Sequence, residues 1–132
     1  MNSRTVTPLG HDGDVNSTQS ILERPVYGIG EAAGLLGLRT DRARARLDGY
    51  ERAGTSYAPV IRPERTGDEV VTWGEFVELG YLREYRREDV PLQRLRPVIE
   101  ELRRALGTPY PLATASRSTF KSVLASRRRS PS

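Results

Sequence analysis

Two short apolar stripes at helical spacing, separated by one Gly-Leu turn, constrain the fold of this 132-residue chain more than any other feature. In residues 27–36, apolar side chains recur at the 3, 4 and 7 spacing of one buried helix face: Ile29, Ala32, Ala33 and Leu36. Gly37 and Leu38 break this pattern, and glycine is the residue that a tight turn accepts most easily. Thr40 is expected to N-cap a second helix over residues 41–50. This order predicts a helix-turn-helix.

The next segment changes from helical to β-type periodicity. Residues 60–62 and 69–72 are short strand-like runs, and residues 63–68 have the composition of a hairpin loop. We therefore expect a β-hairpin, or wing, directly after the second helix.

Two further helices are predicted after the hairpin. Thr72 and Glu75 have the spacing of a capping box, which predicts that a helix begins at Trp73 and runs to about residue 87. Leucines and Ile99 at helical spacing predict another helix over residues 91–106, in which Pro97 causes a kink or a late start. Trp73 and Leu47 are expected in the core. The predicted fold class is therefore mainly α, with a small β-hairpin wing and two further helices.

Composition divides the chain into three zones. Residues 1–24 are polar and lack periodicity, which predicts a disordered leader. Residues 113–132 carry five basic residues and no acid, and are predicted to be a disordered Ser/Arg-rich tail. The domain between them, residues 25–112, has 14 basic and 14 acidic residues, so the net charge of +4 arises in the tail. An argument for nucleic-acid binding must therefore depend on where the arginines lie.

The composition also excludes several functional classes. No apolar run approaches the ~20 residues of a membrane-spanning helix, and no signal-peptide pattern opens the chain, so a cytoplasmic protein without membrane association is expected. The chain has no cysteine, and its one histidine, His11, lies in the leader without partners for a metal site or a catalytic triad. We expect no metal, no cofactor and no enzymatic activity.

The second predicted helix is the densest basic stretch of the central zone. Arg39, Arg42, Arg44 and Arg46 accompany a single acid, Asp41. A helix in this position enters the major groove of DNA, where arginine pairs with guanine O6 and N7. The alternative, an amphipathic helix with a solvated arginine face, stays open. The candidate DNA-binding residues, including those expected from the wing, are Arg39, Thr40, Arg42, Arg44, Arg46, Arg62 and Arg65.

Several blocks of the sequence resemble a known family. Residues 27–38 are similar to the opening helix-turn of MerR-like winged-helix domains. Five blocks more closely resemble the N-terminal DNA-binding domain of actinobacterial VapB-type antitoxins. They are residues 24–33 (RPVYGIGEAA), 47–50 (LDGY), 59–63 (PVIRP), 71–78 (VTWGEFVE) and 90–97 (VPLQRLRP). The resemblance covers about residues 24–113.

The resemblance implies a cytoplasmic antitoxin of a type II toxin–antitoxin pair. Its implied partners are double-stranded DNA, as its own operator, and a PIN-domain ribonuclease toxin. The family continues into a C-terminal domain, which is expected to be missing here, and Ala45 stands where many relatives have a bulky aromatic. From the positions of the arginines, we expect base contacts from Arg39 and Arg42, and phosphate contacts from Arg44, Arg46, Arg62 and the tail. A homodimer is expected through the helix over residues 91–106. The alternatives are a protein-interaction adaptor with the same fold and a truncated gene product without toxin-neutralising activity.

Overall fold

The computed structural model describes residues 21–128, which form six helices and two small antiparallel strand pairs. The elements follow in the order β1 (Pro25–Gly28), α2 (Ile29–Leu36), α3 (Thr40–Asp48), β2 (Tyr50–Arg52), β3 (Thr55–Tyr57), β4 (Val70–Thr72), α4 (Trp73–Arg87), α5 (Leu92–Leu106), α6 (Pro111–Thr114) and α7 (Arg117–Arg128). The predicted mainly α class is confirmed. Predictions for residues 1–20, including His11, and for residues 129–132 lie outside the described residues. Within residues 21–128, no helix has both the length and the apolar character required to cross a bilayer.

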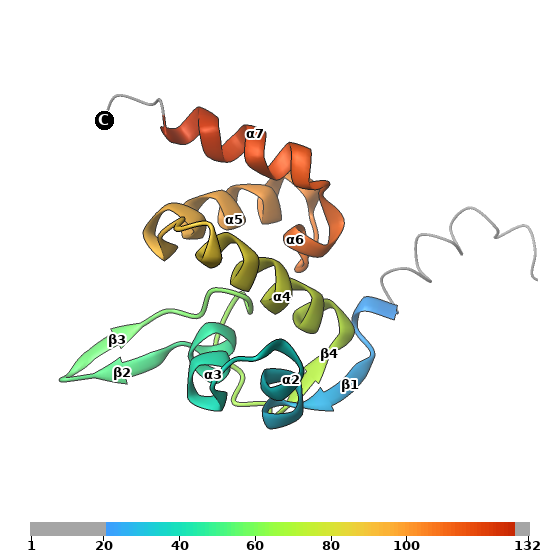
Figure 1. The fold of residues 1–132 in the computed structure, drawn as a ribbon, viewed down its shortest axis with the longest axis vertical. Coiled ribbons are helices and arrows are strands. Elements are labelled where there is room, and N and C mark those ends of the chain that lie inside the picture. The colour runs from blue at the N-terminus through green and yellow to red at the C-terminus, as the bar shows by residue number, and fades with distance from the viewer. Residues whose placement is uncertain (1–20, 129–132) are drawn as a thin grey trace, which may run out of the picture.

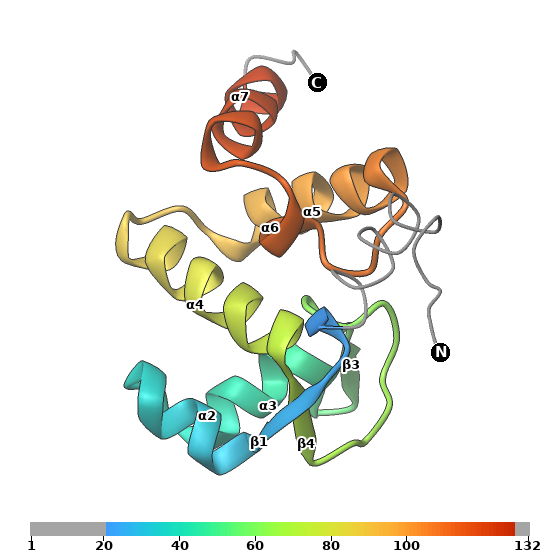
Figure 2. The ribbon, with the colours of Figure 1, turned by 90° about the vertical axis from the view of Figure 1, so that its right-hand side faces the viewer.

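Helix α4 lies in the middle of the structure. Helices α2 and α3 and the strand pairs lie on one side of it, and α5, α6 and α7 lie on the other (Figures 1 and 2). One continuous core joins the two sides, with the predicted Leu47 fully buried. The prediction that Trp73 is buried is wrong, because its side chain is 37% exposed and stacks at the surface on Phe76.

Local signals explain how the first helices begin and end. Gly37 ends α2 in the left-handed conformation, with φ of 69°, which favours glycine. The expected N-cap at Thr40 is wrong by one residue: Arg39 occupies the cap position, and no side chain caps α3. The capping box at the start of α4 is confirmed, since Glu75 N donates to Thr72 Oγ1 and Thr72 N donates to Glu75 Oε1.

The predicted hairpin is wrong in its position. The strands that follow α3 are β2 and β3, which pair Tyr50 with Tyr57, whereas β4 pairs with β1. The turn between β2 and β3 is Ala53-Gly54, with both residues at positive φ, as two-residue hairpins require. Residues 60–62 form no strand, because the N–H groups of Val60 and Ile61 both donate to the carbonyl of Arg46 instead.

Arg62 forms the centre of a buried polar network. Its guanidinium donates to Asp48 Oδ1 at 2.9 Å and to Glu75 Oε2 at 2.8 Å, and its side chain is only 3% exposed. Asp48 also accepts hydrogen bonds from the backbone of Thr66 and Gly67. Burial alone would raise the pKa of Asp48, but the hydrogen bonds from Arg62 and Thr66 hold it below its ordinary value. This network fixes an irregular loop to the end of α3 and the start of α4.

A second buried carboxylate fixes the segment that follows α5. Glu78, on α4, is fully buried, and its Oε2 accepts hydrogen bonds from the N–H groups of Leu112 and Ala113. Its Oε1 has no hydrogen-bond partner within the described residues. Burial raises the pKa of Glu78 to about 8, although the two backbone N–H groups lower it.

The prediction of a disordered tail from residue 113 is wrong as far as residue 128. Ser116 Oγ accepts a hydrogen bond from Thr119 N at the start of α7, as an N-cap does. Phe120 is 2% exposed and stacks on Tyr85 of α4, and Leu124 is 8% exposed. Helix α7 also contacts α5. Most of the apolar face of α5 is therefore buried within the chain, although Leu106 is 44% exposed, and the expected homodimer stays a prediction. Helix α5 begins at Leu92 and continues through Pro97.

Leu124→Ala tests whether α7 is part of the domain. We expect a loss of about 2 kcal/mol in the free energy of unfolding, at the low end of the range for a buried leucine because the site lies at the edge of the core. Urea denaturation measures this loss, and faster tryptic cleavage at Lys121 should accompany it. Ser122→Ala, at an exposed site on the same helix, is the matched control. Equal stability of the two variants would show that α7 does not pack.

Candidate nucleic-acid interface

A basic hollow lies between α3, strand β2 and the start of α5. It has a volume of about 480 Å³, and five arginines line it: Arg39, Arg42, Arg46, Arg52 and Arg96. Asp41 is the one carboxylate in this lining, and it forms an ion pair with Arg39 at 3.0 Å. Within the described residues, the other four arginines have no carboxylate partner. The hollow is therefore strongly positive.

The periodicity of α3 determines which of its arginines reach the hollow. Arg39, Arg42 and Arg46 are spaced three and four residues apart, which places them along one side of the helix. Ala43 and Leu47 point into the core and anchor the helix from behind. The side of α3 that carries the three arginines consequently faces the hollow, where Arg39 and Arg42 are exposed and Arg46 is largely buried.

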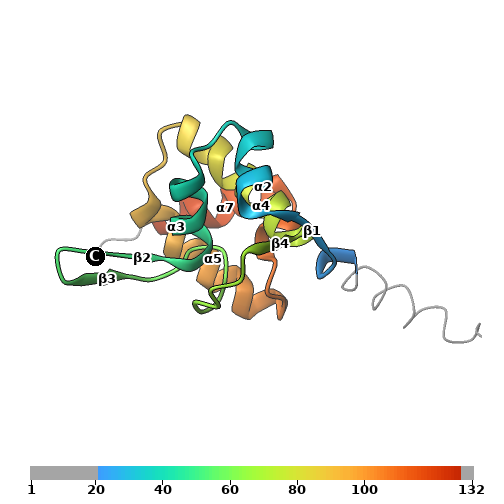
Figure 3. The same cartoon turned by 90° about the horizontal axis from the view of Figure 1, so that it is seen from below.

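The hairpin β2–β3 projects from the body of the molecule beside α3 (Figures 1 and 3). Gly49 lies at the turn between α3 and β2 and has φ of 77°. A Cβ at this position would lie 2.2 Å from the carbonyl oxygen of Tyr57. Arg96 from α5 donates to the carbonyl of Ala58 at 2.9 Å and so supports the base of the hairpin.

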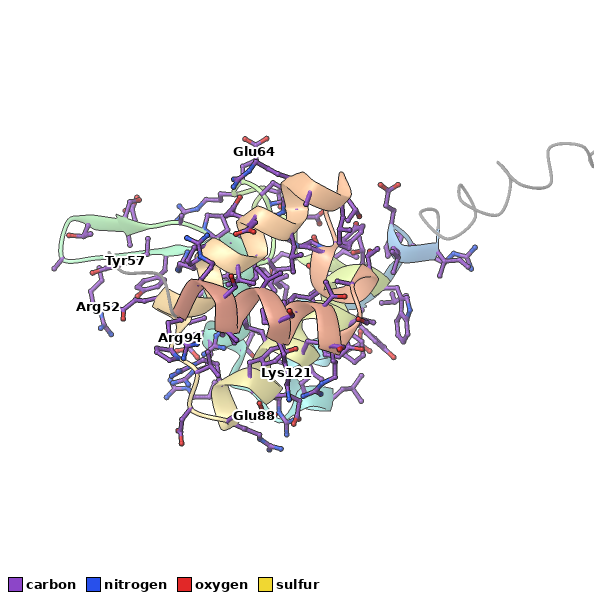
Figure 4. All side chains as sticks on the ribbon, turned by 90° about the horizontal axis from the view of Figure 1, so that it is seen from above. Arg52, Tyr57, Glu64, Glu88, Arg94 and Lys121 are labelled. Atoms are coloured by element: carbon purple, nitrogen blue, oxygen red, sulfur yellow. The ribbon has the colours of Figure 1, made fainter. Side chains whose placement is uncertain are left out.

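All six residues of the two hairpin strands are exposed. Tyr50 and Tyr57 stack on one another with ring centroids 4.6 Å apart. Arg52 and Tyr57 lie on the projecting hairpin (Figure 4), and Arg52 lines the hollow between the hairpin and the helices. The hairpin thus presents an aromatic pair and a cation to solvent.

Arg46 differs from the other arginines of the hollow because it is 8% exposed. In the described part of the chain, its guanidinium forms no ion pair with a carboxylate, and the residue lines a hollow on either side. Burial, followed by the nearby charges of Arg42 and Arg86, lowers the pKa of Arg46 to about 10. Arg46 therefore stays charged at neutral pH, and the two neighbouring charges that shift its pKa, Arg42 and Arg86, are both positive.

A second, smaller hollow of about 260 Å³ continues the basic face toward α4. Arg42 and Arg46 line it together with three arginines of α4: Arg83, Arg86 and Arg87. Glu84 pairs with Arg83 and Arg87, whereas Arg86 donates to the carbonyl of Val90. The two hollows meet at Arg42 and Arg46, so one basic surface extends from the hairpin to the end of α4.

The structure brings together only part of the predicted site. Arg39, Arg42 and Arg46 lie in the hollow, and Thr40 is exposed at the start of α3 outside its lining. Arg44 instead forms an ion pair with Glu69. Arg65 is exposed, but its Nε donates to the carbonyl of Asp48 and it lines neither hollow. The expectation that Arg62 contacts DNA is wrong, because its guanidinium is buried between Asp48 and Glu75.

Sequence reasoning missed several arginines of this surface. Arg52 lies on a hairpin whose position the sequence does not predict, because its Ala53-Gly54 turn lacks the Asn-Gly or Asp-Gly pair that is typical of such turns. Arg96 and the three arginines of α4 are distant in sequence from α3, and only the packing of α4 and α5 brings them to the hollows. No local pattern in the sequence indicates that packing.

Comparison with known proteins gives one curated relative and no function. A protein of Mycobacterium tuberculosis (strain ATCC 25618 / H37Rv) named "Uncharacterized protein Rv2308" is 45% identical over 98 residues. These residues are 74% of this chain and 41% of the relative, so the chain spans about two fifths of the relative's length. No family model matches the chain, and no solved structure matches it.

Proposed function

We propose that this protein binds double-stranded DNA as a MerR-like winged helix-turn-helix domain. In this proposal α2 and α3 are the two helices of the motif, α3 enters the major groove, and the hairpin β2–β3 is the wing. The observation that carries the proposal is the hollow in which α3, the hairpin and α5 gather five arginines around a single carboxylate. Such a surface complements a polyanion, and an exposed helix beside it matches the docking of helix-turn-helix proteins.

The positions of the arginines suggest separate roles. Arg39, the N-cap residue, and Arg42 are exposed at the N-terminal end of α3, the part of a recognition helix that contacts base edges. Bidentate contact of such an arginine with guanine contributes about 1–3 kcal/mol of sequence discrimination. Arg52, on the projecting hairpin, is placed to contact the adjacent backbone. Contacts with phosphate increase affinity for all sequences alike.

We further propose that the chain is the DNA-binding component of a VapB-type antitoxin that binds its own operator. The support is the resemblance of its sequence blocks to that family. In this structure the blocks coincide with structural contacts: Asp48, Arg62 and Glu75 form the buried network, and Gly49 makes the turn into the hairpin. The resemblance therefore supports the fold more directly than the partner, which would be a PIN-domain ribonuclease toxin.

A protein-interaction adaptor is the second candidate. Three exposed apolar side chains favour this candidate, because exposed apolar groups are suited to contact with another protein. They lie on the strand pair β1–β4 and at the start of α4: Val26, Val70 and Trp73. An adaptor of this kind would show no preference for any duplex.

Fluorescence anisotropy with labelled duplexes tests DNA binding. One duplex carries the DNA upstream of the gene, another carries a scrambled sequence, and both are titrated at several salt concentrations. Arg42→Ala should reduce the preference for the upstream duplex about tenfold, which corresponds to the lower half of the range for one lost base contact. Arg52→Ala should weaken binding to both duplexes and reduce the salt slope by about 1, as expected for one lost phosphate contact.

Lys121→Ala is the control for charge alone. Lys121 is exposed on α7, which lies on the opposite side of α4 from α3 (Figure 1). Affinity and preference should not change in this variant. Deletion of the tail, residues 113–132, is not a suitable control for charge, because it also removes Phe120 and Leu124 from the core. If all three substitutions weaken binding equally and no duplex is preferred, α3 does not read DNA and the adaptor is favoured.

A further inference from the structure

The two most buried arginines of the described chain are in opposite electrostatic situations. Arg62 is 4% exposed and its guanidinium lies between two carboxylates. Arg46 is 8% exposed and lies near Arg42 and Arg86, with no carboxylate bonded to it in the described residues. Desolvation of a charge is costly and a counter-ion offsets that cost, and the Arg46 guanidinium is accessible only through the two hollows that it lines. Arg46 therefore lacks the counter-charge that Arg62 has.

We propose that Arg46 and Arg86 bind one phosphate group at the junction of the two hollows, with Arg42 at its mouth. Arg42 and Arg46 line both hollows, so an anion can reach Arg46 from either side. Arg86 lines the smaller hollow and comes from α4, so the site joins α3 to α4. The site shares Arg42 with the base contacts of the proposed function, whereas Arg46 and Arg86 belong to the phosphate site alone.

The acidic groups near this site are already occupied by other arginines. Asp41 pairs with Arg39 in the larger hollow. Glu84 pairs with Arg83 and Arg87 beside the smaller one. The net positive charge that remains at the junction therefore comes from Arg42, Arg46 and Arg86.

A phosphate group fits this site better than other common anions do. Guanidinium groups bind phosphate oxygens through charge-assisted, often bidentate hydrogen bonds. A tetrahedral anion can accept such bonds from guanidinium groups that approach from different helices. The phosphate group is either a phosphodiester of DNA or a free phosphate. The DNA source rests on the proposed function, whereas binding of free phosphate does not.

Thermal denaturation with inorganic phosphate tests the site directly. Phosphate at millimolar concentration should raise the Tm of the wild-type protein by several degrees above sodium chloride of equal ionic strength, because a ligand of the folded state stabilises it. Arg86→Ala should abolish this increase, and Arg104→Ala, at an exposed position on α5 outside both hollows, should retain it. An equal increase in wild type and Arg86→Ala, or an equal increase with chloride, would overturn the proposal.

Arg46→Met distinguishes an anion site from a structural arginine. If the role of Arg46 is to bind an anion, the methionine variant should match or exceed the wild-type Tm in the absence of phosphate. Addition of phosphate should not raise the Tm of this variant. A structural arginine would instead give a large loss of Tm without phosphate, and this result would contradict the proposal.

Anisotropy with the two duplexes then identifies the source of the phosphate group. If the site holds a DNA phosphodiester, Arg86→Ala should weaken binding to both duplexes equally, and inorganic phosphate should compete with DNA. If phosphate binds but Arg86→Ala leaves DNA affinity unchanged, the ligand is a free phosphate. If no duplex binds at all, the proposed function fails while the Tm increase with phosphate still supports this site.

Discussion

Replacement of Arg62 by methionine should lower the free energy of unfolding by about 3–5 kcal/mol, the loss expected when one partner of a buried ion pair is removed. Methionine has similar length but no charge, so Asp48 and Glu75 would lose the group that neutralises them. The carbonyls of Asp68, in the loop, and of Val70, at the start of β4, also accept hydrogen bonds from Arg62 and would lose this donor. Urea denaturation at neutral pH measures the loss.

Two further variants separate charge from packing at this position. Arg62→Lys keeps the charge, but an ammonium group cannot span acceptors on opposite sides, so a smaller loss of about 2 kcal/mol is expected. Arg65→Met removes an exposed arginine from the same loop and should cost at most about 1 kcal/mol, the value of one ordinary hydrogen bond. If Arg62→Met is no more destabilising than Arg65→Met, the buried network does not stabilise the fold.

Stability should fall by an amount on the order of 4 kcal/mol between pH 4.5 and pH 8 because of Glu78 alone. Burial raises the pKa of Glu78 from 4.5 to about 8, so in this interval the folded protein keeps a proton that the unfolded chain has released. Where the folded state binds more protons, a rise in pH favours unfolding. The stabilising, protonated form is fully present below pH 4.5, and its contribution is lost as pH rises toward 8.

Glu78→Gln should remove this dependence, because the amide stays neutral and keeps an oxygen for the N–H of Leu112. The variant and the wild type should be similar in stability near pH 5, and the variant should be the more stable of the two at pH 8. Urea denaturation at several pH values measures the difference between them. Glu64→Gln, at an exposed loop position, is the control and should track the wild type at every pH. A difference that stays constant from pH 5 to pH 8 would mean that Glu78 is ionised throughout.

Elements with local signals were predictable from the sequence. The hydroxyl of Thr72 and the carboxylate of Glu75 make a capping box within four residues, and this box marks the start of α4 correctly. The apolar spacing of α2 and α3 is equally local. By contrast, the strands β2 and β3 are three residues long and fully exposed, so they have no apolar alternation to reveal them.

Tertiary contacts explain the remaining differences. Val60 and Ile61 have the composition of a strand, but they are buried as irregular backbone that bonds to Arg46. The segment of α7 is rich in Ser and Arg, and its order depends on Phe120 and Leu124 packing on helices far earlier in the chain. For the candidate site, the sequence does not distinguish an arginine that is available to a ligand from one that is buried in an ion pair. Whether an arginine is buried with carboxylates, as Arg62 is, or exposed in a hollow, as Arg42 is, depends on the fold.

Asp48 also has a consequence for the order in which the chain folds. Its partners lie 14 to 19 residues further along the chain, in a loop that has no regular secondary structure. Closing loops of this size has a modest entropic cost, and contacts between residues so near in sequence favour rapid folding. The Asp48 carboxylate at the end of α3 can therefore form its hydrogen bonds with the loop as soon as α4 begins to form. The N-terminal half of the domain should then assemble in one cooperative step, before α7 docks from the far end of the chain.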